Sequence, residues 1–234
     1  PFFDNGLKFF SNQGYKISAE DENKIEDYFF NYDFDNFKIK HSNYGKAVRL
    51  NDAMGRYSEA LKRSADRDLD YSKIKVTLDC ANGAAYKVAP EVLFEMGVDL
   101  HTIADKPSGT NINDRCGSLF PNKASQVVKK KKCNIGICLD GDGDRVILID
   151  EKGDELKGEE LIFIFANYYL KNKSLKKRSK IVTNEIANFG LDMALNKLGL
   201  KLIRVKVGDK NILQEIHKNN YFFGGEPSGH FIFR

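Results

Sequence analysis

Apolar residues in this chain fall in short runs between polar turns, and the runs occur twice in the same order. The first set has a strand, a turn, a helix and a strand at 73–79, 80–83, 84–96 and 98–103. The second set has the same four elements at 180–183, 188–190, 191–198 and 201–207. A glycine, Gly97 or Gly199, follows each helix and is a typical helix terminator. The sequence therefore predicts an internal repeat of a strand–helix–strand unit.

This repeat predicts the fold class. A helix that crosses over between two strands favours their parallel pairing. We therefore expect two successive three-layer α/β domains with mostly parallel mixed sheets. Polar stretches at 45–52 and 150–158 mark the expected boundaries, and the second stretch precedes a predicted helix at 159–170. The acidic and aromatic run 20–37 is expected to form a surface helix. The residues before the first boundary are too few for a core and are expected to finish a third, similar domain.

Composition excludes several classes of protein. The 234 residues are 41% hydrophobic and 30% charged, which suits two cores, and no apolar run approaches the roughly 20 residues of a membrane span. The net charge is only +4, and the basic clusters 129–132 and 176–180 lie near expected helix ends without interleaved aromatics. We therefore expect neither nucleic acid nor membrane as a partner. The four cysteines form no CxxC pair, which indicates reduced thiols in a cytoplasmic protein.

The sharpest chemical signal is the loop Asp140-Gly-Asp142-Gly-Asp144-Arg145 between the predicted strands 135–139 and 146–149. Three unpaired carboxylates this close would repel one another by roughly 1–4 kcal/mol per pair, and a divalent cation would relieve that repulsion. A cation with three protein carboxylates keeps open positions, which magnesium commonly fills with phosphate oxygens. Arg145 suits a phosphate, and a salt bridge to a nearby carboxylate is an equally good interpretation.

Two other interpretations of this loop are open. In a calcium EF-hand, the three aspartates would occupy positions one, three and five, and Glu151 would occupy position twelve. However, position six requires glycine and is Arg145, and the flanks have the pattern of strands rather than helices. The second alternative is an acidic turn without metal, because Asp-Gly pairs are ordinary in hairpins.

Several motifs in order resemble the α-D-phosphohexomutase superfamily over nearly the whole chain. They are the 140–145 loop, Gly224-Gly-Glu-Pro-Ser-Gly-His230, the strand and turn ending at Gly83, and the opening 1–10. The segments 4–10, 111–113, 116–118 and 207–210 are most similar to the phosphoglucosamine mutase branch. The resemblance implies a four-domain protein in which 1–47 ends the first domain, 48–150 is the second and 151–234 is most of the third. It also implies a phosphoserine just before Pro1 and a fourth domain after Arg234.

The resemblance implies roles for particular residues. Asp140, Asp142 and Asp144 would hold Mg²⁺. Glu226 and Ser228 would bind sugar hydroxyls, although their loop is also explained as a hairpin turn before a strand at 231–233. His230 would orient that loop or contact the ligand, and the orienting role is slightly favoured. The remaining expected site residues are Lys8 and Arg145 as catalytic groups, and Asp209 and Lys210 facing the cleft. Lys8 without its motif would be a surface lysine. Lys210 and Pro227 stand where many relatives have arginine and glutamine.

The implied reaction interconverts glucosamine 6-phosphate and glucosamine 1-phosphate through a phosphoserine and a sugar bisphosphate, a step towards cell-wall precursors. The expected partner is a hexosamine phosphate, and a homodimer is left open because the sequence does not give the oligomeric state. Without the serine and the fourth domain, this chain alone is expected to be inactive and to bind magnesium at millimolar affinity or weaker. The alternatives are a phosphomannomutase or phosphoglucomutase of the same superfamily, and a non-catalytic calcium- or sugar-binding module.

Overall fold

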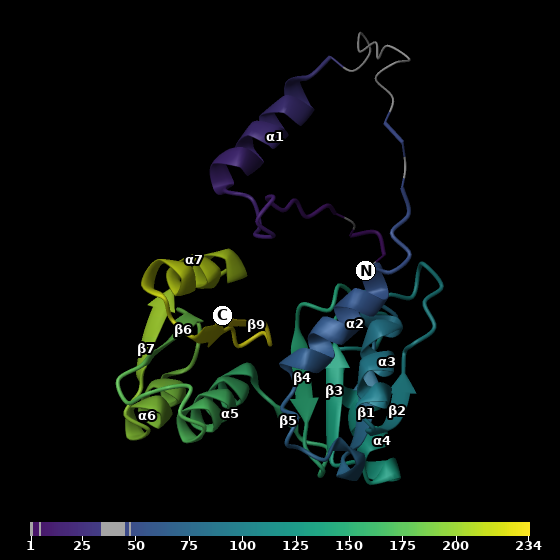
Figure 1. Ribbon diagram of the computed structural model, residues 1–234, viewed down its shortest axis with the longest axis vertical. Coiled ribbons are helices and arrows are strands. Elements are labelled where there is room, and N and C mark those ends of the chain that lie inside the picture. Colours follow the sequence, from purple (N-terminus) through teal and green to yellow (C-terminus); the bar gives the residue numbers. More distant parts are fainter. Residues whose placement is uncertain (1, 5, 34–44, 47) are drawn as a thin grey trace. The chain divides into compact units, whose positions relative to one another are not determined.

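The computed structural model describes residues 2–4, 6–33, 45–46 and 48–234 (Figure 1). Internal contacts divide the chain into a unit of residues 4–54 and a second unit made chiefly of residues 55–234. In the first unit, helix α1 spans Ala19–Asn31, and its N-cap Ser18 accepts a hydrogen bond from the Asp21 N–H at 3.0 Å. No residue of α1 is buried, so the predicted surface helix is confirmed. Of the predicted run 20–37, residues 34–37 lie outside the described residues.

The larger unit contains a five-stranded sheet of order β2-β1-β3-β4-β5 (Figure 1). Its strands are β1 Lys75–Asp79, β2 Asp99–Ile103, β3 Ile135–Leu139, β4 Val146–Ile149 and β5 Glu155–Leu156. The first three are parallel, and β4 and β5 add antiparallel pairings. The helices of this region are α2 Ala53–Ser64, α3 Val88–Glu95 and α4 Asn122–Lys131, with short 3₁₀ turns η3 Tyr71–Lys73 and η4 Ala84–Tyr86. Val128 of α4 packs against Cys138 and Ile149 to form a buried core on the sheet.

The second sheet has four strands in the order β7-β6-β8-β9. Its strands are β6 Lys180–Asn184, β7 Lys201–Val205, β8 Phe223–Gly225 and β9 Phe231–Phe233, and its helices are α5 Gly158–Lys171, α6 Phe189–Lys197 and α7 Asp209–Asn219. Ile181 belongs to a core with residues of α5 and α6, whereas its neighbour Val182 packs against Ile212 and Ile216 of α7. Because side chains alternate along a strand, helices cover both faces and make three layers.

The two sheets repeat one topology. In each, a crossover helix joins two parallel strands, a third parallel strand enters on the other side of the first, and an antiparallel strand follows it. The predicted repeat and the predicted pair of successive α/β domains with mixed sheets are therefore confirmed. The preceding third domain stays a prediction. The loop between β3 and β4 contains the three aspartates, and the equivalent loop between β8 and β9 contains Glu226 to His230. Both loops leave the carboxyl end of a parallel strand, where open α/β sheets bind ligands.

Two predicted elements differ from the structure in kind, and the strands expected at 73–79 and 201–207 are shorter, as β1 Lys75–Asp79 and β7 Lys201–Val205. The helix expected at 84–96 is split into η4 and α3. Pro90 has no N–H to donate to the Tyr86 carbonyl, and its ring opposes helical continuation through that residue. The turn expected at 188–190 is the start of α6, because the Asn188 side chain accepts a hydrogen bond from the Leu191 N–H at 3.2 Å and caps the helix. Gly190 therefore lies within the helix.

One of the two basic clusters lies at a helix end as expected. Helix α4 ends at Lys131, and Lys132 forms a left-handed C-cap. The second cluster, 176–180, follows α5 only after an intervening connection and leads into β6, where the Arg178 N–H bonds to the Gly199 carbonyl at 2.7 Å. That expectation was therefore wrong for the second cluster. Among the helices that the structure describes, none combines the length and apolar character needed to cross a bilayer.

The four cysteines are free and buried, in agreement with the expected reduced thiols. Burial raises the pKa of the Cys80 thiol to about 12 and raises that of Cys138 as well. Because the thiolate is the reactive form, both groups should be inert at neutral pH. We expect a thiol-reactive chromophore to label none of the four cysteines in the native chain and all of them after denaturation. Rapid labelling of Cys80 in the native chain would contradict this burial.

Candidate functional site

The three aspartates of the β3–β4 loop converge. One ligand atom from each of Asp140, Asp142 and Asp144 lies within 4.8 Å of the other two. The loop is held by its own backbone, since the Arg145 N–H donates to Asp140 Oδ1 at 3.1 Å and the Gly143 N–H donates to the Asp140 carbonyl at 3.2 Å. Gly143 has φ +76°, a conformation that favours glycine. The carboxylates are therefore arranged as a group by the hairpin that carries them.

The turn after β1 supports this loop. The Ala84 N–H donates to the Gly141 carbonyl at 2.7 Å, which joins the loop to the turn after β1. A Cβ on Gly83 would lie 2.2 Å from that carbonyl oxygen, so only glycine permits the contact. The Cys-Ala-Asn-Gly turn thus serves as a platform for the acidic loop.

Electrostatics favour a cation at the loop. Burial raises the pKa of Asp140, the charges of Asp142 and Asp144 raise it further, and the hydrogen bond from the Arg145 N–H opposes them. Carboxylate oxygens are the ligands that hard divalent cations prefer, and such a cation would offset both effects. The donor set therefore fits a divalent metal. An EF-hand is excluded, because the loop is flanked by β3 and β4 rather than by helices.

The Arg145 side chain lies near a carboxylate, which is the salt bridge expected as the alternative to phosphate binding. Its Nε lies 4.0 Å from Asp144 Oδ1, at the limit of an ion pair, and the side chain is 46% exposed. A pair this long and exposed contributes little to stability. The guanidinium can therefore turn to an anion at the loop without a large energetic cost.

The Gly224–His230 segment contains the end of β8 and the hairpin turn, Glu226 to His230, that leads to β9. The Glu226 N–H donates to the His230 carbonyl at 2.8 Å, and the Gly229 N–H donates to the Glu226 carbonyl at 3.0 Å. The hairpin turn considered from sequence is therefore present. The same turn contacts the acidic loop, because the Val146 N–H donates to the Gly229 carbonyl at 2.9 Å. The two loops that were singled out separately in the sequence adjoin in the structure.

Glu226 is the buried carboxylate of this second loop. Its Oε1 accepts hydrogen bonds from Asn184 Nδ2 at 2.9 Å and from the Gly208 N–H at 3.1 Å, and its Oε2 lies 3.4 Å from Ser228 Oγ. Asn184 ends β6, and Gly208 precedes α7. The amide and the helix N-terminus thus offset the cost of burying the charge.

His230 lies between two carboxylates from different elements. Its Nδ1 is 4.0 Å from Asp144 Oδ2 in the acidic loop, and its Nε2 is 3.8 Å from Asp209 Oδ2 at the start of α7. The imidazole is only 14% exposed. It therefore spans from the acidic loop to α7, which suits the orienting role favoured from sequence.

The structure gathers most of the predicted site residues but not all of them. Residues from three segments meet at the adjoining loops, namely Asp140, Asp142, Asp144, Arg145, Asp209, Glu226, Ser228 and His230. Lys210 lies in the first turn of α7. Lys8 belongs to the 4–54 unit, where it lines a hollow with residues of α1 and its approach, so its cleft role stays a prediction. Asn184 and Gly208 were not identified from sequence.

Comparison with known proteins identifies the domains. Residues 55–153 match the family model described as phosphoglucomutase/phosphomannomutase, alpha/beta/alpha domain II, and residues 157–234 match domain III of the same family. Proteins named phosphoglucosamine mutase from Geotalea uraniireducens and Syntrophus aciditrophicus are 47% and 45% identical over 100% of this chain. The matched region is 51% and 52% of those relatives, so the chain spans about half their length.

Solved structures share the fold at low sequence identity. A putative phosphomannomutase from Thermus thermophilus is 21% identical with a TM-score of 0.75, over 93% of this chain and 49% of that one. An Aspergillus fumigatus N-acetylphosphoglucosamine mutase, solved with GlcNAc-6P and magnesium, is 21% identical with a TM-score of 0.56, over 76% of this chain and 40% of that one.

Proposed function

The chain belongs to the phosphoglucomutase/phosphomannomutase family, and from that premise we propose that it carries domains II and III of a phosphoglucosamine mutase. The proposed reaction interconverts glucosamine 6-phosphate and glucosamine 1-phosphate. The observation that carries the proposal is the contact between the acidic loop and the Glu226 loop, made by Val146 with Gly229 and by Asp144 with His230. Phosphomutase chemistry needs a charge-neutralising site and a sugar site side by side.

The acidic loop supplies the charge-neutralising part of the proposed site. Asp140, Asp142 and Asp144 would hold Mg²⁺, which when bound offsets charge on a phosphoryl group. Arg145 would turn its guanidinium from Asp144 to a phosphate oxygen. Lys8 would assist proton transfer or offset phosphoryl charge from its own domain. Transfer of a phosphoryl group needs alignment and charge compensation more than covalent help from the protein.

The Glu226 loop supplies the sugar-binding part. Glu226 would accept a hydrogen bond from a sugar hydroxyl through Oε2, and the Ser228 hydroxyl beside it would contact a neighbouring hydroxyl. His230 would hold this loop against Asp144 and Asp209, and Lys210 would face the substrate from α7. We further propose that 1–47 ends a first domain, 48–150 forms the second and 151–234 forms most of the third.

The full-length enzyme provides the test of this function. We expect it to act on glucosamine phosphate in preference to glucose and mannose phosphates, with activity that requires magnesium. Preference for mannose or glucose phosphate would assign it to another branch, and Pro227 and Lys210 are the departures that make this comparison necessary. Absence of turnover on all three sugars, together with a preference for calcium, would support a non-catalytic module instead.

Substitution Glu226→Gln tests the sugar site within that assay. The change keeps the shape and removes the charge, so a charge-assisted hydrogen bond worth roughly 1.5 kcal/mol should be lost. We expect kcat/KM for glucosamine phosphate to fall about tenfold. The matched control is Glu215→Gln on α7, whose half-buried side chain accepts a hydrogen bond from Asn219 Nδ2. Equal activities of the two variants would contradict a substrate contact at Glu226.

A further inference from the structure

Asn184 is a buried polar residue to which the proposed reaction assigns no role. It ends β6, at the place that Asp79 takes at the end of β1 in the first repeat. It is 1% exposed, and among the described residues its Oδ1 has no hydrogen-bond partner. An unsatisfied buried acceptor costs about 1–3 kcal/mol. Stability alone therefore does not explain an asparagine here, and its side-chain hydrogen bond to Glu226 is the feature that needs a function.

That bond fixes which Glu226 oxygen is available to a ligand. Asn184 Nδ2 and the Gly208 N–H both donate to Oε1, so this oxygen has both acceptor positions filled by protein. The other oxygen, Oε2, lies beside Ser228 Oγ. A glutamate has several rotatable bonds, and ordering them when a ligand binds costs free energy. Because Asn184 and Gly208 already hold Glu226 in one conformation, the side chain would be ordered before the sugar binds.

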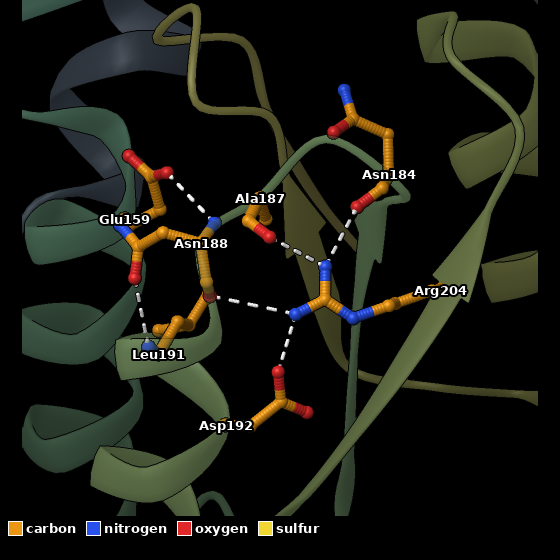
Figure 2. Close-up of polar contacts among 7 residues, drawn as sticks. All are labelled: Glu159, Asn184, Ala187, Asn188, Leu191, Asp192 and Arg204. Atoms are coloured by element: carbon orange, nitrogen blue, oxygen red, sulfur yellow. Dashed lines mark hydrogen bonds and ion pairs between the residues drawn. The ribbon is translucent and has the colours of Figure 1, made fainter.

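The backbone that carries Asn184 is itself clamped by Arg204 of β7, as Figure 2 shows. Arg204 Nη1 donates to the carbonyls of Ala187 at 2.7 Å and Asn184 at 3.4 Å. Its Nη2 donates to the Asn188 carbonyl at 3.4 Å and pairs with the Asp192 carboxylate of α6. A planar fork with fixed donors is suited to holding several carbonyls at once. The turn after β6 is therefore tied to β7 and α6.

A third element completes the clamp. Glu159 at the start of α5 accepts a hydrogen bond from the Asn188 N–H at 3.2 Å (Figure 2). The Asn188 side chain caps α6 through the Leu191 N–H. The end of β6 is thus held by β7, α5 and α6, while the Asn184 side chain bonds to Glu226 in the next loop. Such a rigid support is what a precisely oriented ligand group requires.

We propose that Asn184 is a positioning residue that presents Glu226 Oε2 and the Ser228 hydroxyl as a preformed pair for two sugar hydroxyls, and that Arg204 holds the backbone from which it acts. This inference rests on the proposed function for its substrate, a hexosamine phosphate. The orientation of Glu226 by Asn184 is a separate claim and can be tested in this chain without any substrate.

Substitution Asn184→Asp is the direct test, because it keeps the shape, removes the donor and places a second carboxylate against Glu226. In the 234-residue chain we expect the Gly208 amide to shift in NMR spectra and to lose about tenfold of its hydrogen-exchange protection, since its acceptor moves away. In the full-length enzyme we expect KM for glucosamine phosphate to rise about tenfold or more, while kcat changes less. The matched control is Thr183→Val, the preceding buried residue, whose Oγ1 has no partner among the described residues.

The outcomes separate the two claims. An unchanged Gly208 amide in Asn184→Asp would overturn the orientation of Glu226, whatever the enzyme does. A shifted amide with an unchanged KM in an active enzyme would overturn the role in substrate binding. A wild-type enzyme without mutase activity would refute the proposed function. The Gly208 amide in Asn184→Asp would still show whether Asn184 orients Glu226. If Asn184→Asp does not fold, Asn184→Ala removes the same donor without adding charge and is judged by the same measurements.

Discussion

Replacing Gly229 with alanine is expected to destabilise the larger unit by roughly 2.5 kcal/mol and to separate the two loops of the candidate site. Gly229 has φ +89°, and a Cβ there would lie 2.3 Å from the Val146 carbonyl oxygen. The left-handed backbone alone costs a residue with a side chain about 1–2 kcal/mol. The contact would also break the Val146 N–H bond to the Gly229 carbonyl, worth a further 0.5–1.5 kcal/mol or so. Chemical denaturation of the wild-type chain and of Gly229→Ala measures the total loss in the free energy of unfolding.

Gly109 provides the matched control for this prediction. It has φ +92°, and a Cβ there would meet nothing within 4 Å. Gly109→Ala should therefore cost only the backbone term, about 1–2 kcal/mol. The difference between the two variants isolates the contact between the loops. Equal losses of stability would mean that the Val146 contact does not hold the loops together.

The strands next to the site could be predicted from the sequence with their observed bounds. The predicted strands 135–139, 146–149 and 231–233 are β3, β4 and β9 of the structure. Each is a short apolar run between glycines, aspartates or a polar turn, so the end of the apolar run and the end of the strand coincide. The acidic loop and the Glu226 loop were therefore placed correctly at strand ends.

Long-range partners could not be predicted in the same way. Asn184 and Glu226 are 42 residues apart, and no local pattern indicates that the end of one strand donates to a loop after another. The contact between Val146 and Gly229 likewise depends on how the second sheet meets the first loop. Lys8 is a second example of this limit. Its motif predicts a catalytic role, but the residue lies in the 4–54 unit, and the sequence does not say where that unit meets the candidate site. Tertiary contacts decide such residues, and periodicity does not report them.

Replacing Asp142 with asparagine should have opposite effects with and without metal. Asp142 is exposed, and its ligand oxygen lies within 4.8 Å of those of both neighbouring aspartates. At that separation each pair of charges repels by about 1–3.5 kcal/mol before ionic screening. Without divalent ions, Asp142→Asn should therefore be as stable as the wild-type chain or more so. The effect of metal should be reversed, because the variant has lost one of three anionic ligands.

With magnesium present, the wild-type chain should gain stability and Asp142→Asn should not. At ten times the dissociation constant, binding contributes about 1.4 kcal/mol to the native state. Loss of a direct ligand should weaken affinity by more than the 10–100-fold typical of supporting groups, so that gain should vanish at the same concentration. In the full-length enzyme, turnover should fall by about 100-fold or more. Thermal unfolding with added magnesium or a chelator, and titration calorimetry, measure both effects.

The control for this prediction is Asp154→Asn, an exposed aspartate in the turn before β5 that changes the net charge equally. It should leave the magnesium response unchanged, which separates binding at the loop from a general effect of charge. If Asp142→Asn responded to magnesium like the wild-type chain, the loop would be an acidic turn without metal, and the charge-neutralising half of the proposed site would be lost. If both chains bound calcium far more strongly than magnesium, the loop would bind metal without supporting the proposed phosphoryl chemistry. The paired measurement therefore tests the electrostatic basis of the site before any sugar is added.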